Sequence, residues 1–562
     1  MNSIPKLTDA VIRARYIDAN TQKETQWTDG GTAQLDIRLD SVSASCVQVR
    51  IMPKIPVSFT HFSLTVPFSF AAEDRIFVNG FQSWTDTREY LADDKMYGFH
   101  RITERYMNAR RQAKRGLNRA GDYVFHKYPR RKGQFYAQGY GYVRRGETVF
   151  LCASLSDRSG YTFVEFDAQA QTVTFEKELE GVTYTEETVL AEFCLLCGTY
   201  DDVFDEWFAK MGILPPNENR NTYGYTTWYN YYTNINLDIV RQDLEALERH
   251  GGFEIFQIDD GYQTAVGDWF SLNKQKFPCE MRDLAEMIHA KKLKAGLWLA
   301  PFAAQSSSRL FRDRPDWFVK DSNGNPYPAG PNWHTFYALD IYNPQVVSYL
   351  EMLFDTVLHQ WGFDMVKLDF LFAAAVLPHH NKTRGEIMYD AMELVRRLTG
   401  DKLLLACGVP MMPAFGNADF CRIGADVSLS WKRGWFDGRE NASTPNAVDA
   451  AVFRRHLNGR AFQNDPDVFL LRDKNIHMNL QRRKIIATVN ALCGNLLFCS
   501  DNVSEYTPAQ EAVLHSIFQS KNRRLQSAEY IKRDVLQLIY LEDGTKKTLC
   551  FNVRNGKVYL WK

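Results

Sequence analysis

The chain has 562 residues and no excess of charge of either sign, because 67 Lys and Arg residues balance 67 Asp and Glu residues. Nucleic acids, polyphosphates and anionic membranes usually require a strongly basic surface, so this balance argues against such partners. Long apolar runs are also missing: no window approaches about 18 consecutive apolar residues, the length that would span a membrane. The composition is compatible with a small neutral partner.

Cysteine is too sparse for a small disulfide scaffold, since ten residues are scattered between Cys46 and Cys550. The amino-terminal segment lacks the charged start, apolar stretch and small-residue cleavage site of a secretory signal. We therefore expect reduced, mostly buried thiols in a cytoplasmic protein. Cys194 and Cys197 form a lone CxxC in a strand-like run, and without a second pair at zinc-site spacing the favoured interpretation is core packing.

The sequence pattern changes twice along the chain. Residues 1–205 are short runs that alternate apolar and polar side chains, which is typical of an antiparallel β-sandwich. Residues 206–520 alternate strand-like and helical runs, and residues 521–562 return to β pattern with Asp543-Gly544 as a hairpin turn. We expect three domains: an N-terminal β-supersandwich, a central barrel, and a small C-terminal antiparallel β domain that packs on the barrel.

The central region contains eight strand-like runs separated by helical runs. Asn236 and Asn343 stand where helices begin, as N-caps, and glycines follow several helix ends. Eight β/α units in roughly 300 residues match a (β/α)₈ TIM barrel. The predicted strands are YGYTTWYN, FEIFQID, KAGLWLAPF, FDMVKLDF, KLLLACGVP, ADFCRIG, DVFLLR and GNLLFCS.

Charged residues close several of these apolar runs, at the strand ends where barrel active sites form. Lys367 and Asp369 are two apart and share one face of a strand. Arg422 and Asp426 are four apart and also share a face if the segment stays extended. We expect these residues to meet at one rim of the barrel, together with others of the same kind: Asp259, Asp260, Lys367, Asp369, Arg422 and Asp426.

Two carboxylates offered to one cavity suit hydrolysis of a glycosidic bond. One attacks the sugar or activates water, while the other protonates the leaving oxygen. Neighbouring Lys and Arg side chains lower one carboxyl pKa, and repulsion between the carboxylates raises the other, so the two roles separate.

Simpler interpretations stand beside this one. Asp–Lys and Asp–Arg pairs at strand ends are often structural salt bridges, and Asp-Asp-Gly is often only a turn. Trp228 and Trp298 have a core interpretation as well, although the position of Trp298 at a strand end favours a site. His379 and His380 have no third ligand at recognisable spacing, so loop residues are favoured over metal ligands.

An ordered set of motifs resembles the α-galactosidases of glycoside hydrolase family 36, in their shorter bacterial and archaeal form. The set consists of NGFQSWT, TWYN, IDDGYQ followed by GDW, LWLAPF, KLDF, CGVP, RIGADV and NDPD. The resemblance extends over essentially the whole chain and implies the same three-domain architecture that the sequence pattern predicts.

The resemblance also implies roles for the charged residues. Asp369, in the Lys-x-Asp pattern, would be the nucleophile, and Asp426, in the Arg-x-x-x-Asp pattern, the general acid/base. Asp259 and Asp260 would hydrogen-bond the outer hydroxyls of galactose. The remaining ring hydroxyls would be held by two basic side chains, Lys367 and Arg422.

Some of the aromatic residues, which make up 14% of the chain, would line the site, since aromatic rings pack on the apolar C–H faces of sugars. By the resemblance Trp298 would form a wall of the galactose subsite, and Trp84 would reach in from the N-terminal domain. Cys407 and Gly408 would lie near O2. One motif departs from the family, because Tyr262 stands where a Trp is common, and Asp465 with Asp467 would give supporting contacts.

The resulting hypothesis is a retaining α-galactosidase that cleaves terminal α-D-galactosyl residues by double displacement. An α-N-acetylgalactosaminidase or an α-galactosyl transglycosylase is an alternative, and a non-catalytic sugar-binding relative is an alternative of another class. Neither a metal nor an organic cofactor is expected, since acid and nucleophile suffice. The expected partner is an α-galactoside, with no nucleic acid and no membrane; barrels commonly self-associate, so a homo-oligomer is compatible with the sequence.

Overall fold

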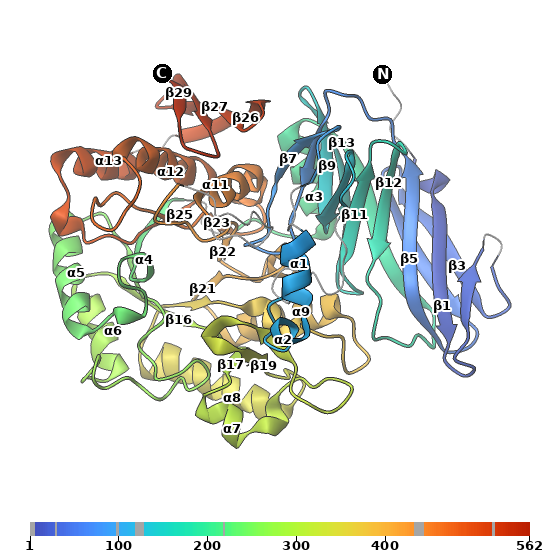
Figure 1. Ribbon diagram of the computed structural model, residues 1–562, viewed down its shortest axis with the longest axis horizontal. Coiled ribbons are helices and arrows are strands. Elements are labelled where there is room, and N and C mark those ends of the chain that lie inside the picture. Colours follow the sequence, from blue (N-terminus) through green and yellow to red (C-terminus); the bar gives the residue numbers. More distant parts are fainter. Residues whose placement is uncertain are drawn as a thin grey trace.

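The computed structural model describes residues 6–28, 31–96, 101–118, 129–216, 220–431, 443–519 and 523–562. Two antiparallel sheets form the N-terminal part, a parallel sheet wrapped by helices forms the centre, and a small antiparallel sheet ends the chain (Figure 1). The predicted combination of β domains and a barrel is confirmed. The predicted domain boundary at residues 520 and 521 lies outside the described residues.

The N-terminal sheets have strand orders β2-β1-β5-β12-β11-β8 and β3-β4-β13-β10-β9-β6-β7. Alternate residues of β1 and β12 are buried, as the period-two pattern predicts, and they pack between the sheets. The elements are β1 Val11–Asp18, β2 Glu24–Trp27, β3 Leu35–Ser43, β4 Cys46–Pro53, β5 Val57–Pro67, β6 Arg75–Val78, β7 Arg88–Leu91, α1 Arg101–Asn108, α2 Arg110–Ala113, β8 Gln134–Gln138, β9 Tyr140–Arg145, β10 Thr148–Ser154, β11 Thr162–Asp167, β12 Thr172–Lys177, β13 Thr188–Gly198 and α3 Tyr200–Met211.

The cysteines of these sheets are free, like the other cysteines of the chain. Cys194 is buried in β13, in agreement with core packing, but Cys197 is exposed. The two residues are three apart on one strand, so their side chains point to opposite faces of the sheet. The CxxC therefore does not form a metal site, and only its first residue belongs to the core.

The central sheet has the order β23-β22-β21-β20-β16-β15-β14-β25-β24, and neighbouring strands in it are parallel. Its strands are buried on both faces, which explains their nearly continuous apolar runs. The strands are β14 Thr222–Thr226, β15 Ile255–Ile258, β16 Lys294–Leu299, β20 Met365–Leu368, β21 Leu403–Ala406, β22 Phe420–Arg422, β23 Gln463–Asp465, β24 Val468–Phe469 and β25 Leu496–Cys499.

A broken seventh strand closes the barrel. β23 pairs with β22 at one end of the sheet, and β24 pairs with β25 at the other. Only Pro466 and Asp467 separate the two half-strands, and Pro466 has no N–H to donate to a ladder. The predicted strand DVFLLR is therefore the second half of a strand that begins earlier, at Gln463.

Helices surround the barrel where the sequence predicts them (Figure 1). The side chains of Asn236 and Asn343 cap α5 and α8, accepting hydrogen bonds from the N–H groups of Ile239 and Gln345. The predicted first strand is too long, since β14 ends at Thr226 and Trp228 begins α4. The helices are α4 Trp228–Tyr231, α5 Leu237–His250, α6 Met281–Ala290, α7 Arg309–Asp313, α8 Pro344–Asp355, α9 Arg384–Thr399, α10 Met411–Ala414, α11 Thr444–Phe453, α12 Leu480–Cys493 and α13 Pro508–Gln519.

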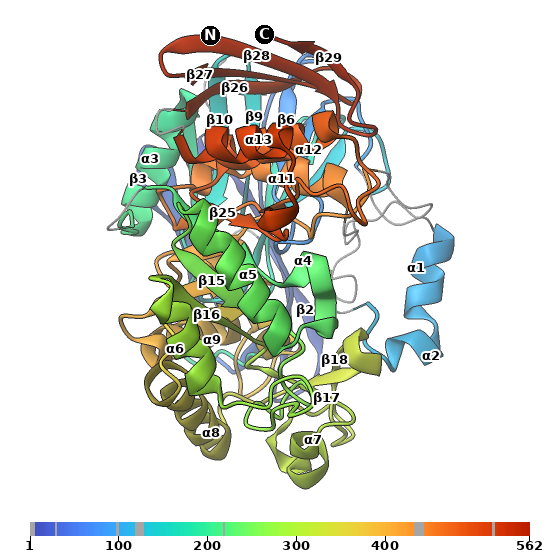
Figure 2. The same ribbon diagram turned by 90° about the vertical axis from the view of Figure 1, so that its left-hand side faces the viewer.

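The long β16–α8 connection carries a small sheet of its own, in the order β17-β19-β18. It lies low in the view of Figure 2, with α2 close to β18. Arg115, just after α2, donates to the carbonyl oxygen of His334 at 3.2 Å. The strands are β17 Ala303–Gln305, β18 Pro328–Gly330 and β19 Phe336–Ala338.

The C-terminal sheet packs on the barrel helices, as predicted (Figure 2). Tyr530 of β26 stacks on Phe453 of α11, with ring centroids 5.7 Å apart. Trp431 donates its indole N–H to the carbonyl oxygen of Val553 at 2.7 Å. Asp543 and Gly544 form the hairpin turn between β27 and β28, both with positive φ. The strands are β26 Arg523–Lys532, β27 Val535–Glu542, β28 Thr545–Asn552 and β29 Val558–Trp561.

The side chain of Arg454 joins the N-terminal part to the barrel through hydrogen bonds. Arg454, just after α11, is fully buried. Its guanidinium donates to the side chain of Asn79 and to the backbone carbonyl of Ile423, a barrel residue. It also donates to the carbonyl oxygens of Gly80, Gln82 and Ser83 in the segment between β6 and β7. This segment, residues 79–87, is thereby held at the mouth of the barrel.

None of the described helices is long and apolar enough to cross a membrane.

Candidate active site

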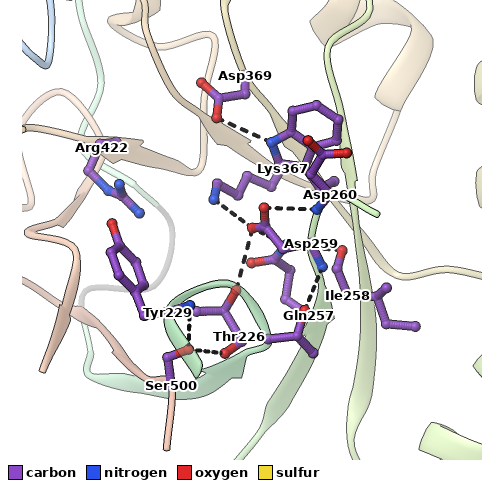
Figure 3. Close-up of polar contacts among 12 residues, drawn as sticks. Thr226, Tyr229, Gln257, Ile258, Asp259, Asp260, Lys367, Asp369, Arg422 and Ser500 are labelled. Atoms are coloured by element: carbon purple, nitrogen blue, oxygen red, sulfur yellow. Dashed lines mark hydrogen bonds and ion pairs between the residues drawn. The ribbon is translucent and has the colours of Figure 1, made fainter. Parts of the chain in front are cut away.

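The charged residues that close the barrel strands meet in one region (Figure 3). Asp259 directly follows β15, Lys367 lies in β20, and Arg422 ends β22. Cys407, directly after β21, lies among them: burial raises the pKa of its thiol, Asp369 raises it further, and Arg422 and Lys367 oppose this. Asp426 contributes to the same shift. The sequence-predicted residues therefore share one electrostatic neighbourhood.

Asp259 and Lys367 form a buried ion pair. Lys367 Nζ lies 2.8 Å from Asp259 Oδ2, which also accepts a hydrogen bond from Gln257 Nε2 at 2.9 Å. The backbone N–H of Asp259 donates to the hydroxyl of Thr227 at 3.0 Å. Burial opposes ionisation of Asp259, but the charge and hydrogen bond of Lys367 bring its pKa below the usual value. Lys367 and Asp259 are therefore both charged, and their contacts hold them in place.

Asp260 is held in a different environment. Its Oδ1 accepts a hydrogen bond from Gln263 Nε2 at 2.6 Å, and its Oδ2 accepts one from Trp333 Nε1 at 3.4 Å. Burial raises the pKa of Asp260, and the negative charges of Asp259 and Asp369 raise it further. The carboxyl group is therefore oriented by two neutral donors, without a cation of its own.

Asp369 follows β20 and is only partly buried. One carboxylate oxygen accepts a hydrogen bond from Trp298 Nε1 at 3.2 Å, and the other accepts one from the backbone N–H of Phe370 at 2.8 Å. Its own N–H donates to the carbonyl oxygen of Leu299 at the end of β16. Phe370 has a φ of 54°, a left-handed backbone that an aromatic residue adopts at a cost. The strand end thus turns sharply so that Asp369 faces the site.

Arg422 connects Asp426 to the broken seventh strand. It donates to Asp426 Oδ1 at 3.0 Å and to Asp465 Oδ2 at 2.9 Å, and it lies 2.9 Å from Asp467 Oδ1. Asp467 Oδ2 also accepts hydrogen bonds from the hydroxyl of Tyr229 and the N–H of Val427. Asp465 and Asp467 are fully buried, so these two carboxyl groups without access to water share the single positive charge of Arg422.

Asp426 combines exposure with an unusual proton affinity. Its side chain keeps 40% of its surface exposed. Partial desolvation and the negative charges of Asp467 and Asp369 raise its pKa to about 6, against the opposing effect of Arg422. A carboxyl group with this pKa can both hold and release a proton near neutral pH.

Aromatic rings form one wall of the site. Trp298 lies edge-to-face against Trp269 at 5.8 Å and against Trp333 at 6.2 Å. Tyr262, which departs from the family motif, is fully buried and donates its hydroxyl to the carbonyl oxygen of Trp298 at 3.2 Å. Tyr262 therefore supports the backbone of Trp298, whose own indole N–H orients Asp369.

Trp84 enters from the segment of residues 79–87. Its ring packs edge-to-face on Phe370, with centroids 5.1 Å apart. Gly408 has a φ of 60°, and a Cβ there would approach the Trp84 ring to 3.1 Å, so this close contact suits glycine. The N–H of Gly408 donates to the hydroxyl of Ser83 at 3.0 Å. Both predicted residues thus line the boundary between the N-terminal part and the barrel.

Sequence reasoning missed several residues of the site. Trp333 lies far along the chain in the β16–α8 connection, and no pattern linked it to Asp260. Gln257 stands one position before the end of β15. A polar residue in an otherwise apolar strand is costly to bury, so the sequence could have indicated that Gln257 belongs to the site. Tyr229 appeared only within a motif, and its hydrogen bond to Asp467 depends on closure of the barrel.

Comparisons with known proteins agree with this geometry. A model of the Melibiase family matches residues 223–393, from β14 into α9. An α-galactosidase from Escherichia coli is 24% identical over 286 residues, which are 48% of this chain and 38% of that protein. The A type blood alpha-D-galactosamine galactosaminidase of Flavonifractor plautii is 28% identical over 198 residues, 32% of this chain and 18% of that protein. The matches thus span well under two thirds of these curated relatives.

Solved structures match over most of the chain. The α-galactosidase TtGalA from Thermus thermophilus, in complex with p-nitrophenyl α-D-galactopyranoside, has a TM-score of 0.70 at 25% identity over 91% of this chain and 96% of that one. The α-galactosidase AgaA from Geobacillus stearothermophilus, of glycoside hydrolase family 36, has a TM-score of 0.60 at 13% identity, covering 96% and 80%, and supports the fold alone. Together with the Melibiase match over residues 223–393, these likenesses show that the chain is similar to α-galactosidases, in sequence over part of the barrel and in fold over most of its length.

Proposed function

We propose that this protein is a retaining α-galactosidase, with Asp369 as nucleophile and Asp426 as general acid/base. The observation that carries the proposal is the difference between the two carboxyl groups. Asp369 is oriented by two N–H donors, whereas the partly exposed Asp426 has a pKa raised to about 6. Retaining glycosidases need one carboxylate fixed for attack and another that exchanges a proton.

In the first step Asp369 attacks the anomeric carbon while Asp426 donates its proton to the leaving oxygen. The bond between the sugar and the aglycone breaks as the bond between the sugar and Asp369 forms, and the aglycone leaves as an alcohol. In the second step Asp426, now ionised, removes a proton from water, and the water oxygen attacks the anomeric carbon. Asp369 is released, and Asp426 is protonated again.

The other charged groups suit recognition of a hydroxyl-rich sugar. Asp259 and Lys367 present an ionised acceptor and a charged donor at 2.8 Å from each other, and Asp260 adds an oriented carboxyl group. Trp298, Trp333 and Phe370 give the apolar surface that a sugar ring covers. Solved relatives named as complexes with p-nitrophenyl α-D-galactopyranoside and stachyose support galacto-oligosaccharides as substrates.

Replacement of the nucleophile tests the mechanism. We expect Asp369→Gly to lower turnover of p-nitrophenyl α-D-galactopyranoside by roughly 10³-fold or more. Azide should then restore part of the activity, because it fits the space left by the carboxylate and attacks in its place. Asp473→Asn is the matched control: its side chain is 67% exposed, pairs with Arg483 and lies outside the site. Full activity of Asp369→Gly would contradict the assignment.

Replacement of the acid gives an independent test. Asp426→Ala should slow cleavage of raffinose-type substrates by about 10²–10⁴-fold, since their leaving oxygen needs a proton. Aryl galactosides with good leaving groups should lose far less in the first step. Equal losses on both substrate classes would count against a role for Asp426 in protonation.

The stereochemistry of the product tests retention directly. Proton NMR of the first turnovers should show the α-anomer of galactose before mutarotation, as two inversions at one carbon require. Initial release of the β-anomer would establish single displacement and remove the covalent intermediate from the proposal.

A galactose with a nitrogen substituent at C2 is the second candidate substrate, favoured by the similarity to the α-D-galactosamine galactosaminidase of Flavonifractor plautii. A panel of aryl α-glycosides that differ at C2 and C4 separates the two activities. We expect galactosides to react faster than N-acetylgalactosaminides, and the reverse order would replace the substrate. Sugar binding without turnover of any panel member would indicate the non-catalytic alternative, and product analysis with added acceptors measures transglycosylation.

A further inference from the structure

Two histidines and an aspartate meet outside the active site, on two neighbouring connections of the barrel. Asp340 follows β19 in the β16–α8 connection, and His379 and His380 lie in the β20–α9 connection. The three side chains bring one ligand atom each to within 4.8 Å of one another. The sequence offered no third ligand for the two histidines, because Asp340 is far from them along the chain.

The distances fit one shared cation. Asp340 Oδ1 lies 3.5 Å from His379 Nε2, and Asp340 Oδ2 lies 3.0 Å from His380 Nε2. Around a tetrahedral zinc ion with bonds of about 2.0–2.1 Å, neighbouring ligand atoms lie about 3.3 Å apart. The two measured distances stand on either side of that value.

His379 supplies the strongest evidence. Its Nδ1 lies 2.9 Å from the carbonyl oxygen of Leu377, which only accepts hydrogen bonds, so Nδ1 carries a hydrogen. A neutral ring then has a lone pair on Nε2, and this buried atom has no hydrogen-bond partner among the described residues. A lone pair and a carboxylate oxygen 3.5 Å apart repel each other unless a positive charge lies between them. Metal-binding histidines commonly show this backbone contact on their other nitrogen.

The neighbouring groups leave the position open to a cation. Lys382, the nearest lysine along the chain, pairs with Glu386 at 2.5 Å and Asp390 at 3.0 Å instead of with Asp340. Tyr342 packs against both imidazole rings and limits their movement. The side chain of His380 is 49% exposed, so solvent reaches the cluster and can complete the coordination.

We propose that the Asp340–His379–His380 cluster binds a divalent transition-metal cation, Zn²⁺ by the nature of its ligands. Imidazole nitrogen and carboxylate oxygen are both zinc ligands, and the site has room for solvent. The bound ion ties the β16–α8 connection to the β20–α9 connection. The first connection carries Trp333 and the second begins at Asp369, so the ion steadies both sides of the barrel mouth. This role is structural and independent of the proposed glycosidase activity.

Calorimetric titration of the untagged, full-length, chelator-treated protein with Zn²⁺ tests the proposal. One equivalent should bind saturably and raise the melting temperature. Asp340→Asn, His379→Gln and His380→Ala should each weaken binding by about tenfold or more. His289→Ala is the matched control, because His289 pairs with Asp364 at 2.7 Å without belonging to the cluster, and it should bind Zn²⁺ like the parent.

The exposed thiol of Cys197 is the competing zinc ligand, so Cys197→Ser should also keep the parent affinity. Absence of saturable binding to the parent would overturn the proposal. Unchanged affinity in both Asp340→Asn and His380→Ala would overturn it as well. His379 would then be a doubly protonated ring that donates to Asp340. The exposed position of His380 makes its variant safe for folding, and circular dichroism checks each variant.

Discussion

Asp369 and Asp426 are the same residue type, and their surroundings give them different properties. Asp369 receives hydrogen bonds from Trp298 and Phe370. Burial and the negative charges of Asp467 and Asp369 raise the pKa of Asp426 to about 6, against the opposing charges of Arg422 and Lys367. The residue next to each carboxylate thus decides its chemistry.

The raised pKa predicts the pH dependence of activity. The first step of the proposed mechanism needs protonated Asp426, so kcat/KM should fall by about tenfold per pH unit once the pH rises above about 6. Asp467→Asn removes a negative charge that raises this pKa, and the decline should then begin at lower pH. pH–rate profiles of the parent, Asp467→Asn and the exposed-site control Asp473→Asn measure the shift. An unmoved decline in Asp467→Asn would contradict the assignment of Asp426.

Trp333 orients Asp260 without being recognisable from the sequence. Trp333→Phe keeps an aromatic ring but removes the N–H that donates to Asp260 Oδ2 at 3.4 Å. We expect KM to rise by about 2- to 10-fold, from the loss of about 0.5–1.5 kcal/mol, with kcat changed less. Trp561→Phe removes a comparable indole hydrogen bond, to Tyr540, outside the site and should leave both constants unchanged. A change confined to kcat would indicate a different role for Trp333.

At the scale of elements, the half-strands β23 and β24 both close the barrel and help to position Asp426. Asp465 ends β23 and Asp467 precedes β24, and Arg422 of β22 binds both. Asp465 and Asp467, on either side of Pro466, both point toward one guanidinium. Closure of the barrel and orientation of Asp426 therefore depend on the same set of contacts.

Removal of this arginine should be costly. Arg422→Met leaves two fully buried carboxylates, those of Asp465 and Asp467, without their paired cation. We expect the free energy of unfolding to fall by about 3–5 kcal/mol. The loss should be greater at pH 8 than at pH 5, because the unpaired carboxyl groups bind protons more readily in the folded state than in the unfolded state. Urea denaturation at both pH values measures it. Arg397→Met, at a surface pair with Glu351, should cost less than about 1 kcal/mol.

At the scale of the whole molecule, the N-terminal part contributes directly to the barrel mouth. Arg454 binds the segment of residues 79–87, and this segment places Trp84 against Phe370 and Ser83 against Gly408. A second buried pair, between Arg384 of α9 and Glu178, joins the same two parts with hydrogen bonds of 2.6 and 2.7 Å. We infer that the N-terminal sheets and the barrel unfold together.

Arg454→Met tests this coupling. Loss of the buried guanidinium removes a donor from the carbonyl oxygens of Gly80, Gln82 and Ser83, so the melting temperature should fall and KM should rise as Trp84 loses its support. Arg460 also joins the two parts, but its partners Asp201 and Asp205 are exposed, so Arg460→Met should have little effect. Scanning calorimetry of the parent should show one transition for both parts. Separate transitions would contradict the coupling.

Periodicity predicted the strands and helices because it reports which face of each element is buried. It could not show that the seventh strand breaks at Pro466, because the break is visible only in the pairing. β23 pairs with β22, whereas β24 pairs with β25. The division at residue 205 into separate domains stays a prediction, and Arg454 shows how strongly the parts on either side are joined.

The sequence by itself determined the architecture and the principal carboxylates. Apolar runs that end in Asp or Lys mark the carboxyl ends of parallel strands, and these ends meet at one face of any such barrel. Only the tertiary structure decided the contacts between distant residues: Trp333 with Asp260, Arg454 with residues 79–83, and Asp340 with His379 and His380. Such contacts depend on how loops cross the mouth of the barrel. No local pattern records that path, because a loop residue is constrained by its partner in space and not by its neighbours in the chain.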